Sequence, residues 1–162
     1  ISYGIFDFYD GTPQTDLVLM TSHELMHMWF YGTIGNNHAL EPWLDEAFAT
    51  YAELLYYQEY HPDNVEWWWA IRIHEQNPQG FVDSDIRLEG GYVPYRNAVY
   101  LRGVQFLNEV RLAVGEQEFF AALKDYAYTN TWRIATRKDF FDATARHSSA
   151  DLGSIISKYF KN

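Results

Sequence analysis

Two histidines four residues apart, His23 and His27, enclose a glutamate in the sequence His-Glu-Leu-Met-His. In an α-helix these positions differ by only about 40° around the axis, so both imidazoles can reach one metal ion. Neutral imidazole is one of the usual ligands of zinc. Glu24 is rotated by about 100°, where it can reach a water on the open side of the ion and act as a general base. The spacing therefore predicts a hydrolytic zinc site.

A catalytic zinc ion usually keeps a third protein ligand beside its water. Glu46 follows His27 with 18 residues between them, near the start of the next expected helix. A helix–loop–helix hairpin can bring that position beside the first helix. Two neutral imidazoles and one carboxylate leave Zn²⁺ a net charge of +1, which lowers the pKa of bound water toward about 7. We therefore expect one zinc ion per chain, held by His23, His27 and Glu46.

The composition is that of a globular protein and restricts its partners. The 162 residues carry 22 acidic and 12 basic side chains, for a net charge of −10, and we expect one domain over residues 1–162. This acidity argues against nucleic acid as a partner, because nucleic acid requires clustered Lys and Arg. No apolar run approaches the roughly 20 residues of a membrane-spanning helix, so we expect no membrane segment. The chain has no cysteine, which excludes disulfides and thiolate ligands but indicates no cellular compartment.

The apolar spacing predicts a mainly α fold of about six to seven helices, preceded by a short β-like segment at 1–9. Thr15 is expected to cap the first helix, Gly32 and Gly115 to follow helix ends, and Thr136 to begin a capping box. A long loop is expected at 79–92. The expected helices are 16–31, 42–60, one that opens at 62, runs through 66–73 and ends at 77–78, one through 99–114, 116–128, 137–147 and 151–160.

The HExxH pattern, the 18-residue spacing and the stretch Trp-Leu-Asp-Glu-Ala-Phe-Ala-Thr-Tyr around Glu46 resemble the gluzincin metallopeptidases related to aminopeptidase N. The specific match covers about residues 18–56, and a looser one continues to the C-terminus. The resemblance implies the helical lobe of a thermolysin-like catalytic domain. It also implies zinc on His23, His27 and Glu46, with Glu24 activating the water. The activity implied is removal of N-terminal residues from a peptide substrate.

Tyr100-Leu101-Arg102-Gly103 matches the Tyr-x-Lys-Gly stretch of the same family, with Arg102 in place of Lys. The resemblance implies that Tyr100 stabilises the oxyanion of the tetrahedral intermediate. A phenol that donates to a developing negative charge suits this role. Tyr95, five residues earlier, is expected to pack rather than to face the cleft.

Thr50 and Glu53 share a helix face with Glu46 and are candidates for positioning the ligands. A zinc-bound imidazole usually donates its other N–H to a carboxylate, and Glu53 could accept it. The alternative is that Glu53 is a solvated helix residue. Asp45 is expected to be structural and to point elsewhere. The remaining histidines have no partner at ligand spacing and are expected in loops or on the surface: His38, His61, His74 and His147.

The family's amine-recognition stretch, of the Gly-x-Met-Glu-Asn type, does not occur in this sequence. The family's N-terminal β domain and C-terminal helical domain are also missing. We therefore interpret the chain as part of a longer enzyme, weakly active or inactive in isolation. Aromatic residues make up 19% of the sequence, which indicates surfaces for a substrate cleft or for neighbouring domains, with a merely aromatic-rich core as an equal alternative. Such an exposed aromatic surface would also favour self-association of the chain. The alternative functions are a zinc endopeptidase and a non-catalytic interaction module with a vestigial metal site.

Overall fold

A central helix, α2 (Trp43–Tyr60), organises the fold and is buried along most of its length. Its sequence is apolar nearly all around, as is typical of a helix enclosed by others. The polar exceptions include Glu46, Thr50 and Glu53, which recur at helical spacing and are themselves buried. α2 therefore presents a polar stripe inside the protein, and that stripe faces α1 (Asp16–Met26).

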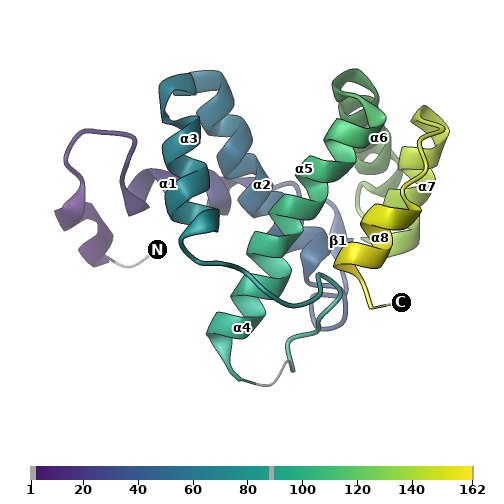
Figure 1. The fold of residues 1–162 in the computed structure, drawn as a ribbon, viewed down its shortest axis with the longest axis horizontal. Helices are drawn as coiled ribbons and strands as arrows, with labels where there is room; N and C mark the ends of the chain where they lie inside the picture. Colours follow the sequence, from purple (N-terminus) through teal and green to yellow (C-terminus); the bar gives the residue numbers. More distant parts are fainter. Residues whose placement is uncertain (1–2, 88–89, 162) are drawn as a thin grey trace.

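The computed structural model describes residues 3–87 and 90–161 and is mainly helical, as predicted (Figure 1). Besides α1 and α2, the α-helices are α3 (Val65–Trp68), α4 (Tyr92–Arg96), α5 (Arg102–Val114), α6 (Glu116–Asn130), α7 (Arg137–His147) and α8 (Gly153–Tyr159). The remaining segments are the 3₁₀ turns η1 (Tyr3–Phe8) and η2 (Pro62–Asn64), the π-helical segments η3 (Trp69–His74) and η4 (Asn97–Leu101), and the strands β1 (Gly35–Asn36) and β2 (Ile134–Ala135).

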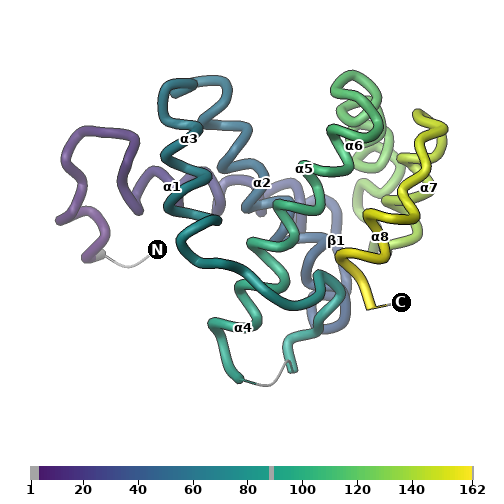
Figure 2. Tube along the Cα trace, in the orientation of Figure 1, coloured from purple at the N-terminus to yellow at the C-terminus, as the bar shows by residue number. Residues whose placement is uncertain are grey.

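α5 runs diagonally through the middle of the trace (Figure 2). α1 and α3 lie toward the N-terminal side, and α6, α7 and α8 lie toward the C-terminal side. α5 approaches α2 closely because Gly103 has no side chain. A Cβ atom at this position would lie only 2.4 Å from Cβ of Ala47. The close approach brings η4, which carries Tyr100, beside the start of α2.

Two short strands connect distant parts of the chain. β1 pairs with β2 in parallel, with Gly35 opposite Ile134 and Asn36 opposite Ala135. β1 belongs to the connection between α1 and α2, while β2 lies between α6 and α7. The connection that separates the two histidines from Glu46 is therefore anchored to the C-terminal helices. Each strand is only two residues long, too short to be predicted from an alternating sequence pattern.

Three local predictions near the N-terminus are wrong. Residues 3–8 form a 3₁₀ helix and not a β-like segment, while residues 1–2 lie outside the described residues. α1 ends at Met26 rather than near residue 31, and Tyr31, with φ +103°, takes the positive φ expected of Gly32. Gly32 is required for another reason, because a Cβ there would lie 2.9 Å from the carbonyl oxygens of His27 and Met28. Thr15 does occupy the N-cap position of α1, as predicted, but its side chain makes no cap hydrogen bond to that helix.

The later boundaries agree better with the sequence. Gly115 follows α5 with φ +96°, which suits a residue without Cβ. Asp139 accepts hydrogen bonds from the backbone N–H and hydroxyl of Thr136, completing the predicted capping box. The helix predicted through 99–114 begins earlier, at Tyr92, so the helical segment includes the end of the expected 79–92 loop. Residues 88–89 of that loop lie outside the described residues.

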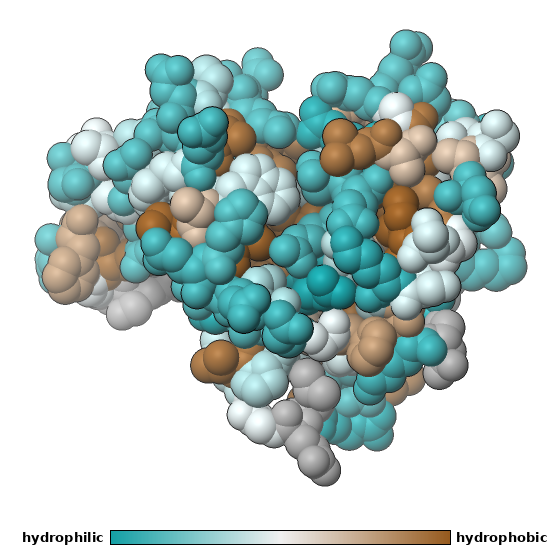
Figure 3. Space-filling model, viewed as in Figure 1, coloured by the Kyte–Doolittle hydropathy of each residue, from teal (hydrophilic) through white to brown (hydrophobic). Residues whose placement is uncertain are grey.

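The surface displays hydrophobic side chains beside the predicted metal motif. Leu25, Met28, Trp29 and Tyr31 are each more than half exposed. On the face shown in Figure 3, hydrophobic residues are scattered among hydrophilic ones, and a notch separates the end that carries α3 from the end that carries α6. Across the described part of the chain, no helix combines the length and apolarity that crossing a membrane requires.

Candidate active site

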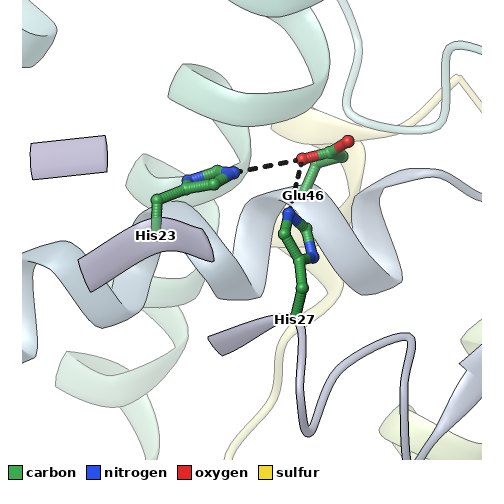
Figure 4. A group of neighbouring side chains, drawn as sticks. All are labelled: His23, His27 and Glu46. Atoms are coloured by element: carbon green, nitrogen blue, oxygen red, sulfur yellow. Dashed lines mark hydrogen bonds and ion pairs between the residues drawn. The ribbon is translucent and has the colours of Figure 1, made fainter. Parts of the chain in front are cut away.

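His23, His27 and Glu46 turn their ligand atoms toward one point (Figure 4). Nε2 of His23 lies 3.3 Å from Oε2 of Glu46, and Nε2 of His27 lies 3.5 Å from the same oxygen. His27 is the C-cap residue of α1 and keeps helical dihedral angles, so the two rings stay on one face. Ligands about 2.0–2.1 Å from a tetrahedral ion are separated by about 3.3–3.4 Å. The donor types and their spacing therefore fit zinc.

The second ring nitrogen of His23 contacts Glu53. Nδ1 of His23 donates to Oε1 of Glu53 at 3.0 Å, and Glu53 is completely buried. Arg72 donates to both carboxylate oxygens at 2.9 Å, and Nε1 of Trp68 donates to Oε2 at 3.3 Å. Burial alone would raise the pKa of Glu53, but the charge of Arg72 and the bond to His23 outweigh it and lower that pKa. Glu53 is thus a buried carboxylate that contacts His23, and the alternative of a solvated residue is wrong.

Asp45 contacts Nδ1 of His27 as Glu53 contacts Nδ1 of His23, contrary to the expectation that Asp45 points elsewhere. Its Oδ1 lies 2.6 Å from Nδ1 of His27, and its Oδ2 accepts from Nδ1 of His38 at 2.7 Å. Asp45 is buried and joins the two imidazoles. The hydrogen bond that Nδ1 of His27 donates to Asp45 is the main cause that raises the pKa of His27 to about 10. His38 is exposed, as expected for a loop residue, but it is not without a partner.

His38, Asp45 and Glu46 form a second group whose ligand atoms lie close together. Nδ1 of His38 is at hydrogen-bonding distance from Asp45, while its Nε2 lies 4.0 Å from Oε1 of Glu46. This arrangement is that of a carboxylate orienting an imidazole. We therefore describe Asp45 and His38 as part of the surroundings of the first group.

The carboxylate of Glu46 accepts hydrogen bonds from three side chains. Burial would raise the pKa of its carboxyl, but hydrogen bonds from His23, His27 and Tyr100 lower it to about 2. Burial and the nearby Glu46 carboxylate raise the pKa of Tyr100, so its phenol keeps its proton and remains a donor. The Tyr100 ring also stacks parallel to the His23 ring at a centroid distance of 5.9 Å. The hydroxyl of Thr50 donates to the main-chain oxygen of Glu46 at 2.7 Å and lies 3.5 Å from Nδ1 of His23.

The predicted catalytic and ligand residues line one cleft of about 330 Å³. Glu24 is exposed on its wall, one residue after the first histidine. Tyr95 packs edge to face against Tyr100 and is partly buried against the core, as expected. Arg102 turns away from the cleft: it donates to the main-chain oxygens of Gly80 and Lys158 and lies over the ring of Tyr159. The complete lining is Met20, His23, Glu24, His27, Glu46, Arg72, Tyr92, Arg96 and Tyr100.

Sequence reasoning missed three residues of this site: Asp45, Arg72 and Arg96. Asp45 precedes the predicted ligand Glu46 in the sequence. Its partner His38 has no second histidine at ligand spacing, so the sequence does not indicate that the two residues meet. Arg72 and Tyr100 lie on the π-helical segments η3 and η4. Such segments are rare and are often found at functional sites, yet nothing in a 3.6-residue periodicity reveals them. The signal that could reveal Arg72 is electrostatic, because a buried Glu53 requires a nearby cation to balance its charge.

Fold and site together define the helical part of a gluzincin-type metallopeptidase. Residues 9–159 match the Peptidase family M1 domain, and the chain belongs to this family.

Similar proteins carry the names of aminopeptidases. Aminopeptidase N of Streptomyces lividans is 29% identical over 143 residues, covering 80% of this chain and 16% of that protein. Human aminopeptidase B is 29% identical over 135 residues, covering 74% of this chain and 20% of its own length. The chain therefore spans about a sixth to a fifth of these relatives.

Solved structures share the fold. An M1 zinc metallopeptidase of Deinococcus radiodurans, a mutant bound to a Tyr-Ser-Ala substrate, superposes with a TM-score of 0.68 at 23% identity, covering 90% of this chain and 33% of that one. A two-domain M1 zinc metallopeptidase mutant bound to L-tryptophan gives 0.70 at 22% identity, covering 91% and 34%.

Proposed function

We propose that this chain carries the zinc-binding half of a peptidase active site that removes N-terminal residues from peptides. The observation that carries the proposal is the meeting of three zinc-type ligand atoms, Glu24 and Tyr100 in one cleft. Membership in the M1 family and the aminopeptidase names of its relatives support the same substrate class. When bound at His23, His27 and Glu46, zinc supplies the Lewis acidity that polarises a peptide carbonyl and acidifies water.

Residues of this chain transfer the protons, stabilise the oxyanion and orient the imidazoles. Glu24 accepts a proton as water adds to the carbonyl carbon, and it returns that proton to the amine nitrogen when the C–N bond breaks. Tyr100 donates its phenolic hydrogen to the carbonyl oxygen as negative charge develops there. Its raised pKa supports this role because the proton stays on the phenol at neutral pH. Glu53 and Asp45 hold the imidazoles so that the Nε2 atoms stay turned toward the metal position.

The proposal is tested with Glu24→Gln in the full-length gene product that carries this chain. This variant keeps the size of the side chain and removes its basicity, so zinc content should stay near one ion per chain. The rate of peptide hydrolysis should fall by about 10²–10⁴-fold. A His27→Ala control should lose the zinc. Zinc content is measured by atomic absorption and hydrolysis with aminoacyl amide substrates.

Three results would count against the proposal. Unchanged turnover in Glu24→Gln would refute the role of Glu24. Zinc that binds without any peptide hydrolysis would favour a non-catalytic metal site. Cleavage of N-acetylated peptides as fast as free ones would refute the aminopeptidase assignment and identify an endopeptidase.

A further inference from the structure

The cleft contains a positive charge that the proposed chemistry does not use. Arg96 lines the same cleft as His23 and Glu24 and is half-buried. It ends α4, four residues before Tyr100, and residues four apart in a helix project to the same side. The guanidinium of Arg96 is thus one helical turn from the phenol assigned to the oxyanion.

Among the residues that the structure describes, Arg96 donates its hydrogen bonds to neutral groups. Its Nη2 donates to Oε1 of Gln76 at 2.8 Å and to Oδ1 of Asn97 at 2.9 Å, and its Nε donates to the same Asn97 oxygen at 3.3 Å. Within residues 3–87 and 90–161, no carboxylate pairs with Arg96 and no acceptor bonds its Nη1. The amides of Gln76 and Asn97 hold one edge of the guanidinium and leave Nη1 available.

The other arginine of the cleft provides the contrast. Arg72 is bound through Nε and Nη2 to both oxygens of Glu53, which neutralises it. Arg96 carries the same permanent charge without such compensation. A guanidinium oriented by neutral neighbours, beside a reacting centre and free of an internal anion, is suited to bind an anion from outside. Its planar array of donors matches the geometry of a carboxylate.

We propose that Arg96 binds a carboxylate of the peptide substrate and so selects among peptides. This inference rests on the proposed peptidase function. Two sources supply that carboxylate: an Asp or Glu side chain near the scissile bond, or the C-terminal carboxylate of a short peptide. Arg96 is a specificity-determining residue in this assignment and takes no part in bond cleavage.

The test compares Arg96→Gln and Arg96→Lys with the zinc-loaded wild type of the full-length gene product. One substrate pair is a dipeptide and its C-terminal amide; the other is a tripeptide with Glu and its counterpart with Gln. Dissociation constants are measured by calorimetry in the Glu24→Gln background, and kcat/KM is measured with Glu24 present. Arg133→Gln is the matched control, because Arg133 is exposed and does not line the cleft.

The wild type should favour the carboxylate member of one pair by about 10- to 100-fold, the range expected for a hydrogen-bonded ion pair. Arg96→Gln should remove that preference in both binding and kcat/KM, Arg96→Lys should keep part of it, and Arg133→Gln should keep all of it. The pair that responds identifies the source of the carboxylate. If Arg96→Gln leaves the binding preference unchanged and hydrolysis continues, the inference is overturned. Absence of hydrolysis with an Arg96-dependent binding preference would instead refute the proposed function alone.

Discussion

The buried Glu53 offers the sharpest test of how the site is held, through the substitution Glu53→Gln. Oε1 of Glu53 accepts from His23 and Arg72, while Oε2 accepts from Trp68 and Arg72. A glutamine side chain has one amide oxygen that can accept hydrogen bonds. Its NH₂ group would face two hydrogen-bond donors in either orientation of the amide. Two donors therefore lose their acceptor, and Arg72 loses its counter-ion in a position where little water reaches it.

The expected loss of folding stability is large. An unsatisfied buried donor costs about 1–3 kcal/mol, and breaking a buried ion pair costs about 3–5 kcal/mol in total. For a chain of this size the melting temperature changes by about 2–4 °C per kcal/mol, so the zinc-free variant should melt about 6–20 °C lower. Zinc affinity should fall by about 10- to 100-fold because His23 loses the carboxylate that orients it.

Arg72→Met separates the two effects. This variant leaves the Glu53 carboxylate without its counter-ion but keeps the bond to His23. It should therefore lose stability while keeping most of its zinc affinity. Glu59→Gln, an exposed change on the same helix, should alter neither property. Stability is measured by thermal and urea unfolding of the zinc-free protein, and zinc affinity by competition with a chelator. Equal losses of zinc affinity in Arg72→Met and Glu53→Gln would refute the reasoning, since a general loosening would then explain both.

Two further predictions concern protons and packing. Zinc affinity should decrease between about pH 8 and pH 6, because the neighbouring carboxylates raise the pKa of His27 to about 10 and a proton must leave before zinc binds. Calorimetry in buffers of different ionisation enthalpy should show proton release, and pH-independent affinity would contradict this. Gly103→Ala should destabilise the protein by about 1–3 kcal/mol, since the new methyl group would lie 2.4 Å from Ala47. The added change Ala47→Gly should recover part of that loss in urea unfolding, and a Gly103→Ala variant as stable as wild type would show that α2 and α5 separate without cost.

The sequence was most informative where one helix alone determines the geometry. The placement of His23 and His27 follows from their spacing, and the shared face of Glu46, Thr50 and Glu53 follows from helical periodicity. These relations involve neighbours within a turn or two, so they can be calculated without knowing the rest of the fold. The approach of Glu46 to the histidines required a hairpin, which the sequence indicated only through the expected helix ends.

The misplaced features depend on contacts between distant segments. The strand pair at Gly35 and Ile134 joins residues about a hundred positions apart, and neither strand is long enough to show an alternating pattern. Tyr31 takes a positive φ because the backbone must turn sharply where Gly32 packs against the end of α1. The role of Asp45 cannot be predicted from its own helix alone. Its partners come from the end of α1 and from the loop that carries His38.

Within the described residues, the carboxylates that contact the two histidines proposed as metal ligands all come from α2, and this explains why so few elements are needed to build the site. Glu46 is the proposed ligand, Asp45 precedes it and contacts His27, and Glu53 follows two turns later and contacts His23. Their relative positions are set by the geometry of one buried helix. α1 then has only to pack in the correct register for both imidazoles to meet a carboxylate at Nδ1 and Glu46 at Nε2. A shift of α1 by one residue would turn the histidines by about 100° and break all these contacts together, so the packing of α1 on α2 and the formation of the site are one event.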